Sequence, residues 1–174
     1  MAKVITKDID FGYKKINKNI KKIRKKPYVK VGFIEGKKGN KLHKNSNGLN
    51  VAEVAALNEF GSMTNIYSTE YGTVIGIPSR PFMRSTFDEN FNKWHKAYND
   101  FALYFLLGDV SLNKQLLMIG EMLKKDIKHK IMNHNFASNS PITIKAKGSS
   151  HPLIDTKQML NSVQYKSYPG GNKE

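Results

Sequence analysis

Two long stretches of the chain place apolar residues at the spacing of an α-helix. In the first, aromatic residues recur at intervals of four, three, four, three and four positions, so they share one side of a helix. They are Phe87, Phe91, Trp94, Tyr98, Phe101 and Phe105. In the second stretch, residues 112–131, leucine and isoleucine follow the same rule. Gly108 separates the two stretches, so the pattern predicts two long helices, the second of them capped by Asp109 or Ser111.

The aromatic stripe of the first long helix is typical of a helix packed against a sheet or of a seam between helices. A cofactor site is the other interpretation of six aromatic residues on one side. No polar group inside the stripe would orient a ligand, which favours a core or seam role.

A shorter, basic helix is predicted near the beginning of the chain. Residues 11–26 contain a thin apolar stripe with lysines between its members, and Pro27 ends the pattern. The stripe consists of Phe11, Ile16, Ile20 and Ile23. Residues 28–34 then alternate between apolar and other residues, which predicts a half-buried strand.

Capping residues mark two further helices. Asn50 is placed to cap a helix over residues 51–60, and Gly61 is placed to end it. Asp155 with glutamine three residues later has the form of a capping box, and Thr156 offers a second cap for the same short helix. A final strand is predicted around residues 163–165.

The remaining segments are poor in apolar residues. Residues 35–50 are predicted to form an exposed basic loop, and residues 62–76 a loop or short hairpin. Residues 142–144 are predicted to be extended within a longer loop. Residues 168–174 are expected to form a C-terminal tail.

These elements predict an α+β fold in a single domain, residues 1–174, with residues 1–27 as a basic helix or arm. A small antiparallel sheet is expected to pack against the two long helices, with extended loops and termini.

The segment IPSRPFMR, residues 77–84, directly precedes the first long helix. Its two prolines fix φ and disfavour a helical conformation of the residue before each, so the segment is expected to be stiff and extended. Such pre-ordering lowers the entropy cost of docking on a partner. Phe82 and Met83 are candidate anchors in a partner's pocket, and Arg80 and Arg84 are candidates to pair with a neighbour's carboxylates.

The alternative is a stiff loop whose phenylalanine completes the chain's own core. We expect a mixed arrangement, with Phe82 inside and the two arginines outside. The candidate protein-interface residues are Ile77, Pro78, Arg80, Pro81, Phe82, Met83, Arg84, Asp155 and Thr156.

The net charge of +15 is unevenly distributed along the chain. Residues 1–44 carry 15 basic and 3 acidic residues, whereas residues 45–110 carry 4 basic and 7 acidic ones. A basic block of this kind favours DNA or an acidic protein surface as a partner, although lysines also serve simply to keep a surface solvated. The candidate residues are Lys14, Lys15, Lys18, Lys21, Lys22, Arg24, Lys25, Lys26, Lys37, Lys38 and Lys41.

The sequence lacks the common signatures of catalysis and cofactor binding. It contains no cysteine, no GxSxG, P-loop or GxGxxG motif, and no histidine in an HExxH or HxH context. We therefore expect no enzymatic activity, no metal site and no cofactor. No stretch approaches the roughly 20 apolar residues of a membrane span, and no signal-peptide core is evident at the start of the chain, so no membrane association is expected.

Three segments, in this order, resemble small structural proteins of tailed bacteriophages. They are VAEVAALNEFG (51–61), IPSRPFMR with the helix that follows it, and GSSHPLIDTKQMLNSVQY (148–165). The combination is similar to the tail completion and head–tail joining group, which includes minor tail protein Z and virion morphogenesis proteins. In that group an EFG segment precedes IPxRPFxR, and PLxDTGxLxxSI ends the domain. This chain departs from the pattern at Lys157, where the family usually has glycine.

The resemblance implies a structural protein of the virion neck that joins the tail to the head connector as part of a ring, with six copies matching the symmetry of the tail. Its partners would be further copies of itself, connector or adaptor proteins, and tail-terminator or tail-tube proteins. It would be assembled in the host cytoplasm, reside at the head–tail interface, and contact DNA in the lumen non-specifically.

The alternative function, based on charge alone, is a nucleic-acid-binding protein that uses its basic N-terminal segment. The aromatic residues are concentrated in the long-helix stripe and are not interleaved with the basic block, so a stacking platform for bases is not evident.

Overall fold

Ten helices and strands make up the described part of the chain. The computed structural model describes residues 10–34, 41–44, 48–68, 74–133 and 135–170. The elements are α1 (Tyr13–Ile23), β1 (Tyr28–Gly32), α2 (Val51–Phe60), β2 (Ser62–Ser68), β3 (Val74–Ile77), α3 (Phe82–Leu107), α4 (Leu112–Asn133), α5 (Pro141–Lys147), α6 (Gln158–Ser162) and β4 (Gln164–Tyr168).

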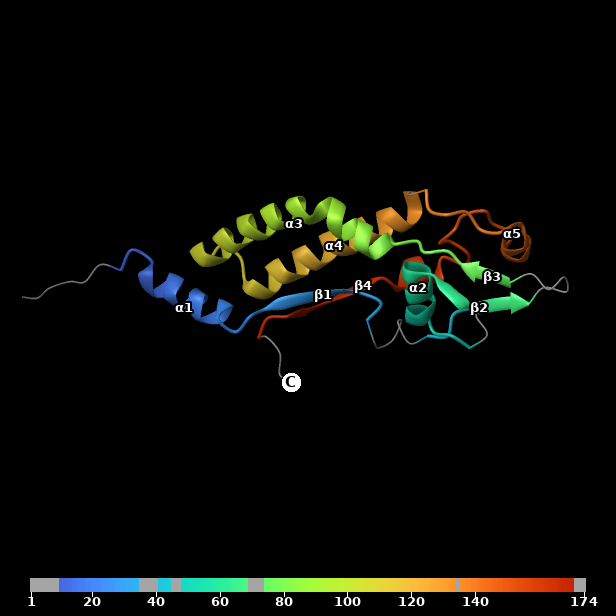
Figure 1. Ribbon diagram of the computed structural model, residues 1–174. Helices are drawn as coiled ribbons and strands as arrows, with labels where there is room; N and C mark the ends of the chain where they lie inside the picture. Colours follow the sequence, from blue (N-terminus) through green and yellow to red (C-terminus); the bar gives the residue numbers. More distant parts are fainter. Residues whose placement is uncertain (1–9, 35–40, 45–47, 69–73, 134, 171–174) are drawn as a thin grey trace, which may run out of the picture.

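The predicted α+β fold is confirmed. The long helices α3 and α4 lie side by side, and the antiparallel pair β1–β4 runs along α4 (Figure 1). Gly120 of α4 faces the sheet, and a Cβ atom there would lie 2.3 Å from the ring of Tyr165. The helix and the strand approach each other closely because α4 has no side chain at this point.

The other elements lie at the two ends of this pair of long helices. The basic helix α1 packs against α3 at one end, and α2, α5 and the β2–β3 hairpin lie toward the other (Figure 1). No helix in the described ranges is long and apolar enough to cross a membrane.

The hydrophobic core is formed where α2, the start of α3, the end of α4 and α6 meet. Phe82 is fully buried in it, and the ring of Phe33 packs against Phe82 edge-to-face at 6.1 Å between centroids. The core side chains are Val51, Ala55, Phe82, Ile127, Ile131, Leu153, Met159, Leu160 and Val163. This core holds together three segments that are far apart in the sequence.

Most of the predicted helix ends are confirmed. Asn50 caps α2 in a full capping box with Glu53, and Gly61 ends the helix. Gly108 ends α3 with a left-handed backbone at φ 83°. The Ser111 Oγ accepts a hydrogen bond from the backbone N–H of Lys114 at 3.3 Å, so Ser111 supplies the predicted cap of α4.

Two predicted local structures are wrong. Residues 142–144 belong to the helix α5 and are not extended, because the Ser140 Oγ accepts from the N–H of Thr143 and Pro141 occupies the first turn. This cap outweighs the β-branched residues that favour a strand. The helix α6 begins at Gln158 after Lys157, without a side-chain cap, so the capping roles predicted for Asp155 and Thr156 are also wrong.

Other predicted segments lie partly outside the described residues. These are residues 1–9 of the basic arm, 35–40 and 45–47 of the predicted loop, and 171–174 of the tail. The predicted hairpin over residues 62–76 matches β2–β3, whose connection at 69–73 is not described. The tail starts one residue later than predicted, because Tyr168 pairs with Tyr28 in the β1–β4 sheet.

Candidate functional site

A buried carboxylate links the first two of the three segments that resemble the phage proteins. The side chain of Glu59, in the EFG segment, accepts hydrogen bonds from the backbone N–H groups of Met83 at 2.8 Å and Arg84 at 3.0 Å. These N–H groups belong to the first turn of α3, where they have no partner within the helix and the helix dipole favours negative charge. Glu59 therefore fixes the start of the longest helix against the end of α2.

Arg80 is buried in the same region. Its guanidinium group donates from Nε to the Ala137 carbonyl at 2.8 Å, from Nη1 to Asn58 Oδ1 at 2.9 Å and from Nη2 to Asn139 Oδ1 at 3.0 Å. Burial lowers the pKa of Arg80 from its usual value, because a charge loses solvation inside the protein. The prediction that Arg80 points outward to a neighbour is therefore wrong.

The other residues of IPSRPFMR are divided between the inside and the surface. Phe82 is inside, as predicted. Arg84 is largely exposed, but its Nε lies 3.0 Å from the Glu59 carboxylate and its guanidinium group lies 5.0 Å from the centroid of the Phe60 ring. Ile77, Pro81 and Met83 are half-buried, and Pro78 is exposed.

The third segment joins the same cluster through Asn139. While Asn139 accepts from Arg80, its Nδ2 donates to the carbonyl of His151 at 3.3 Å. Asp155 is half-buried in this segment and Thr156 is exposed. We call Asn58, Glu59, Arg80, Arg84 and Asn139 the polar hub. Motifs that lie far apart in the sequence are thus one structural unit.

Gly61 is required by the close approach of two of these segments. Its φ is 76°, and a Cβ atom there would lie 2.9 Å from the carbonyl oxygen of Ile77 and 2.9 Å from the nitrogen of Ser79. Any larger residue would push the IPSRPFMR segment away from the end of α2.

Lys157 adopts the left-handed conformation at φ 58°. This is the position at which the sequence departs from the glycine of the phage family. The tight turn before α6 is therefore present even though lysine occupies it, and the left-handed backbone costs an L-residue on the order of 1 kcal/mol.

Replacing Lys157 with glycine is expected to raise the free energy of unfolding by about 0.5–1 kcal/mol, because glycine adopts this φ without a steric penalty. The measurement is urea denaturation followed by circular dichroism. Lys125→Gly, in the exposed face of α4, is the control and should lower the free energy of unfolding by about 1 kcal/mol. A loss of stability in Lys157→Gly would contradict the strain that we assign to this turn.

The aromatic stripe of α3 is not the core seam that the sequence predicts. Phe105 is buried, but Phe87, Phe91 and Tyr98 are 53%, 49% and 48% exposed. The reason is that the β1–β4 sheet packs on α4, so the stripe of α3 is covered only in part, where the Trp94 indole N–H donates to Asp126 of α4 at 2.7 Å and where the end of α1 lies beside Tyr98. The rings of Phe87 and Phe91 are 5.6 Å apart, and those of Phe87 and Trp94 are 5.9 Å apart. We call Phe87, Phe91, Trp94 and Tyr98 the aromatic face.

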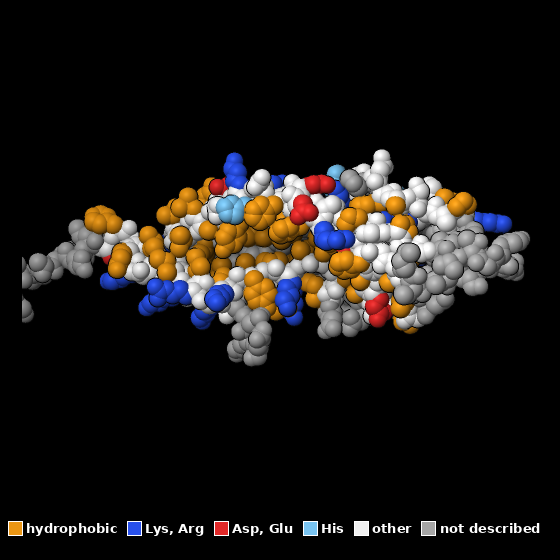
Figure 2. Space-filling model, in the orientation of Figure 1, with side chains coloured by type: hydrophobic (Ala, Val, Ile, Leu, Met, Phe, Trp, Pro, Cys, Tyr) orange, Lys and Arg blue, Asp and Glu red, His pale blue; other side chains and the backbone are white. Residues whose placement is uncertain are grey.

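Further apolar side chains are exposed on α3, on α1 and on the turn before α1, and of these Leu103 and Leu107 lie on the side of α3 opposite the aromatic face. Figure 2 shows hydrophobic side chains gathered over the half of the molecule that contains α1 and most of α3, with Lys and Arg side chains along the lower edge. The exposed residues of these two helices are Phe11, Tyr13, Ile16, Ile20, Phe87, Phe91, Tyr98, Leu103, Tyr104 and Leu107. Exposed aromatic side chains grouped on one face, as Phe87, Phe91 and Tyr98 are, are typical of an interaction site.

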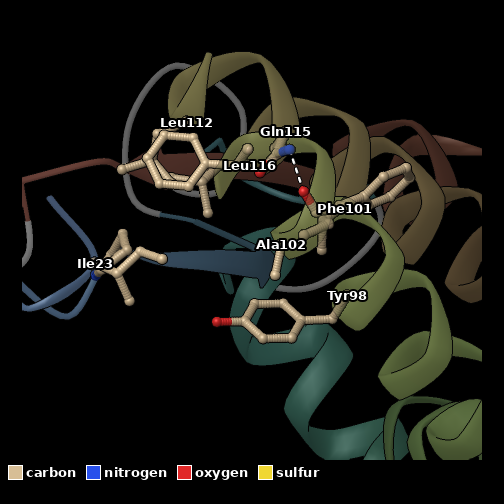
Figure 3. A pocket seen from close by; sticks show the side chains of 10 residues that line it. Ile23, Tyr98, Phe101, Ala102, Leu112, Gln115 and Leu116 are labelled. Atoms are coloured by element: carbon tan, nitrogen blue, oxygen red, sulfur yellow. Dashed lines mark hydrogen bonds between the residues drawn. The ribbon is translucent and has the colours of Figure 1, made fainter. Parts of the chain in front are cut away.

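A groove adjoins the aromatic face where α1 ends between α3 and α4. Figure 3 shows Ile23 on one side of it and Tyr98, Ala102 and Leu116 among the residues on the other. The Gln115 amide donates to the carbonyl of Phe101, so the polar group in this lining already has a partner. The sequence pattern did not reveal this groove, because the position of α1 relative to α3 creates it.

The basic residues of the N-terminal segment lie on the surface. Those that the structure describes are exposed, whereas Lys37 and Lys38 lie outside the described residues. The exposed candidates are Lys14, Lys15, Lys18, Lys21, Lys22, Arg24, Lys25, Lys26 and Lys41. Within the described ranges, no three His, Asp or Glu side chains are grouped so that they could hold a metal ion.

Comparison with known proteins gives no relative for this chain. No model of a known protein family matches the sequence, and neither the curated proteins nor the solved structures contain a significant match.

Proposed function

We propose that this protein is a structural subunit of the neck of a tailed bacteriophage, where it joins the tail to the head connector as one copy of a closed ring of six. The observation that carries the proposal is the exposed apolar surface of α1 and α3. Exposed apolar side chains of this kind are expected to be buried in the functional form of the protein, and contacts between the subunits of an assembly would bury them.

The polar hub supports the resemblance on which the neck assignment rests. The segments that are similar to the neck proteins meet through Glu59, Arg80 and Asn139. Lys157 also retains a left-handed turn where the family has glycine. Residues that hold a fold together are expected wherever that fold occurs, so the motifs indicate a shared fold more than a shared contact surface.

The mechanism of such a subunit is geometric. The polar hub and the core keep α2, α3 and α6 rigid, and the exposed helices present apolar side chains to neighbouring subunits. Rings of this kind stack on the connector or adaptor proteins on one side and on the tail-terminator or tail-tube proteins on the other. Lysines of α1 that face the lumen would contact the passing DNA without reading its sequence.

A nucleic-acid-binding protein is the second candidate function. The specific observation in its favour is that Lys14, Lys18 and Lys21 are exposed along the short helix α1. Cations on a surface helix neutralise DNA phosphates and release counterions, so such binding would weaken steeply as salt is raised.

The test of both functions is the mass of the purified protein in solution, measured by light scattering at physiological salt with and without duplex DNA. We expect a discrete species of six times the chain mass without DNA. A monomer that associates only when DNA is added, and dissociates as salt is raised, would replace the neck proposal with the nucleic-acid-binding one.

A further inference from the structure

We propose that the ring closes through a head-to-tail contact in which the start of α1 of one copy packs on the aromatic face of the next. Phe11 and Tyr13 are the inserted side chains, and Phe87, Phe91 and Tyr98 receive them. This inference rests on the proposed function, because it takes the protein to assemble with copies of itself.

The backbone that carries the inserted side chains is ordered before any partner arrives. Phe11 is 91% exposed and Tyr13 is 73% exposed. The Asp10 carboxylate accepts hydrogen bonds from the backbone N–H groups of Gly12 at 3.1 Å and Lys14 at 3.2 Å, which orders the start of the helix. An apolar pair on an ordered turn loses little conformational entropy when it docks.

The rest of α1 is fixed to the body of the molecule. Asn19 is buried, and its side chain donates to the carbonyl of Phe105 at 2.9 Å. Figure 1 shows the start of α1 beyond the end of α3. The aromatic pair therefore projects from one end of the protein in a defined direction.

The chain cannot cover its own aromatic face with this pair. Asn19 fixes α1 beside Phe105, which is 14 residues along α3 from Phe91, or about 21 Å at the rise of an α-helix. Tyr13 lies on the far side of that attachment point. Phe11 and Tyr13 therefore meet an aromatic face only between copies, which defines a heterologous contact, the type that forms a closed ring where the rotation between copies closes.

The apolar area suits a specific protein interface. Taking about 200 Å² for a fully exposed Phe or Tyr, the five side chains expose about 600 Å² together. Because roughly 60% of an interface is apolar, complete burial of these side chains would correspond to a contact of about 1,000 Å², which is the lower limit for a specific association.

The charges disfavour a contact between two copies of α1. Between residues 14 and 26, α1 and the turn after it carry eight basic and no acidic residues, so two copies of α1 repel each other. The helix α3 carries three acidic residues, Asp88, Glu89 and Asp100, and three basic ones, Arg84, Lys93 and Lys96, so it has no net charge that would repel α1. Asp88 is exposed beside Phe87, and acidic side chains lie at the upper edge of the apolar band in Figure 2.

Cysteine cross-linking tests the contact, because the chain has no cysteine of its own. The double variant Tyr13→Cys/Phe87→Cys, treated with a short bismaleimide, is expected to give a ladder of cross-linked species that stops at six. Each single variant is expected to remain uncross-linked. Both positions are largely exposed, so neither substitution disturbs the core.

The matched control is Tyr13→Cys/Phe60→Cys, which moves the second cysteine to a phenylalanine on α2 that is 67% exposed. It should give no ladder. Dimers of the single Phe87→Cys variant would overturn the inference by indicating a two-fold contact between aromatic faces. An unlinked double variant would overturn it as well.

The mass of the untreated protein separates this inference from the proposed function. A ring of six copies whose double cysteine variant gives no ladder refutes the contact and leaves the neck proposal standing. A ladder that extends without a limit at six supports the contact and refutes the closed ring.

Discussion

Replacing Phe82 with alanine is expected to lower the free energy of unfolding by about 3–5 kcal/mol. The side chain is fully buried where α2, α3, α4 and α6 meet, and its ring packs against Phe33. Alanine would remove the apolar contacts of the whole ring and leave a cavity. The surrounding side chains belong to four different elements, so they cannot all move inward to fill it. Urea denaturation followed by circular dichroism measures the loss.

Phe87→Ala is the matched control for this prediction. It removes the same side chain from the same helix, five residues later, at a position that is 53% exposed. In the dissociated chain the free energy of unfolding should fall by less than about 1 kcal/mol. Equal losses in the two variants would mean that the aromatic face is covered in the isolated chain, contrary to the exposure described above.

The comparison of these two phenylalanines shows what periodicity can predict and what it cannot. The spacing of Phe87, Phe91 and Tyr98 identifies which side of α3 is apolar. It does not identify what covers that side. The sheet packs on α4 because Gly120 admits Tyr165 there, and this choice depends on residues 45 positions apart. An apolar stripe therefore predicts burial by some partner, which need not be the same chain.

Local signals predicted local structure well. The Asn50–Glu53 capping box and Gly108 act within one turn of the backbone, so their effect is visible in a few consecutive letters. Where two local signals competed, at residues 140–144, the cap of Ser140 prevailed over β-branched side chains.

The polar hub could not be recognised in the sequence from local patterns. Arg80 bonds to residues 22, 57 and 59 positions away in the chain. No periodicity connects positions so distant, and an arginine beside prolines is typical of the surface. Arg80 of IPSRPFMR therefore has a structural role, the interface role predicted for the exposed residues of the segment stays a prediction, and we propose the aromatic face of the following helix as the docking surface.

Replacing Arg80 with methionine is expected to lower the free energy of unfolding by about 3–5 kcal/mol. Methionine retains much of the length of the side chain but removes every donor. The side-chain oxygens of Asn58 and Asn139 and the carbonyl of Ala137 would each lose a hydrogen bond from a charged group in a region from which water is largely excluded. The loop that leads into α5 would lose its attachment to α2.

Two further variants separate the geometry of the guanidinium group from its charge. Arg80→Lys keeps the charge, but a single ammonium group cannot reach the separate acceptors that the planar guanidinium group reaches. Its free energy of unfolding should therefore lie between those of Arg80→Met and the unchanged protein. Arg84→Met removes the other arginine of the hub, whose side chain is 55% exposed, and should lower the free energy of unfolding by about 1 kcal/mol. Equal losses of stability in Arg80→Met and Arg84→Met would contradict the central role of Arg80. The polar hub would then depend on the exposed Arg84 and its ion pair with Glu59 as much as on the buried guanidinium group of Arg80.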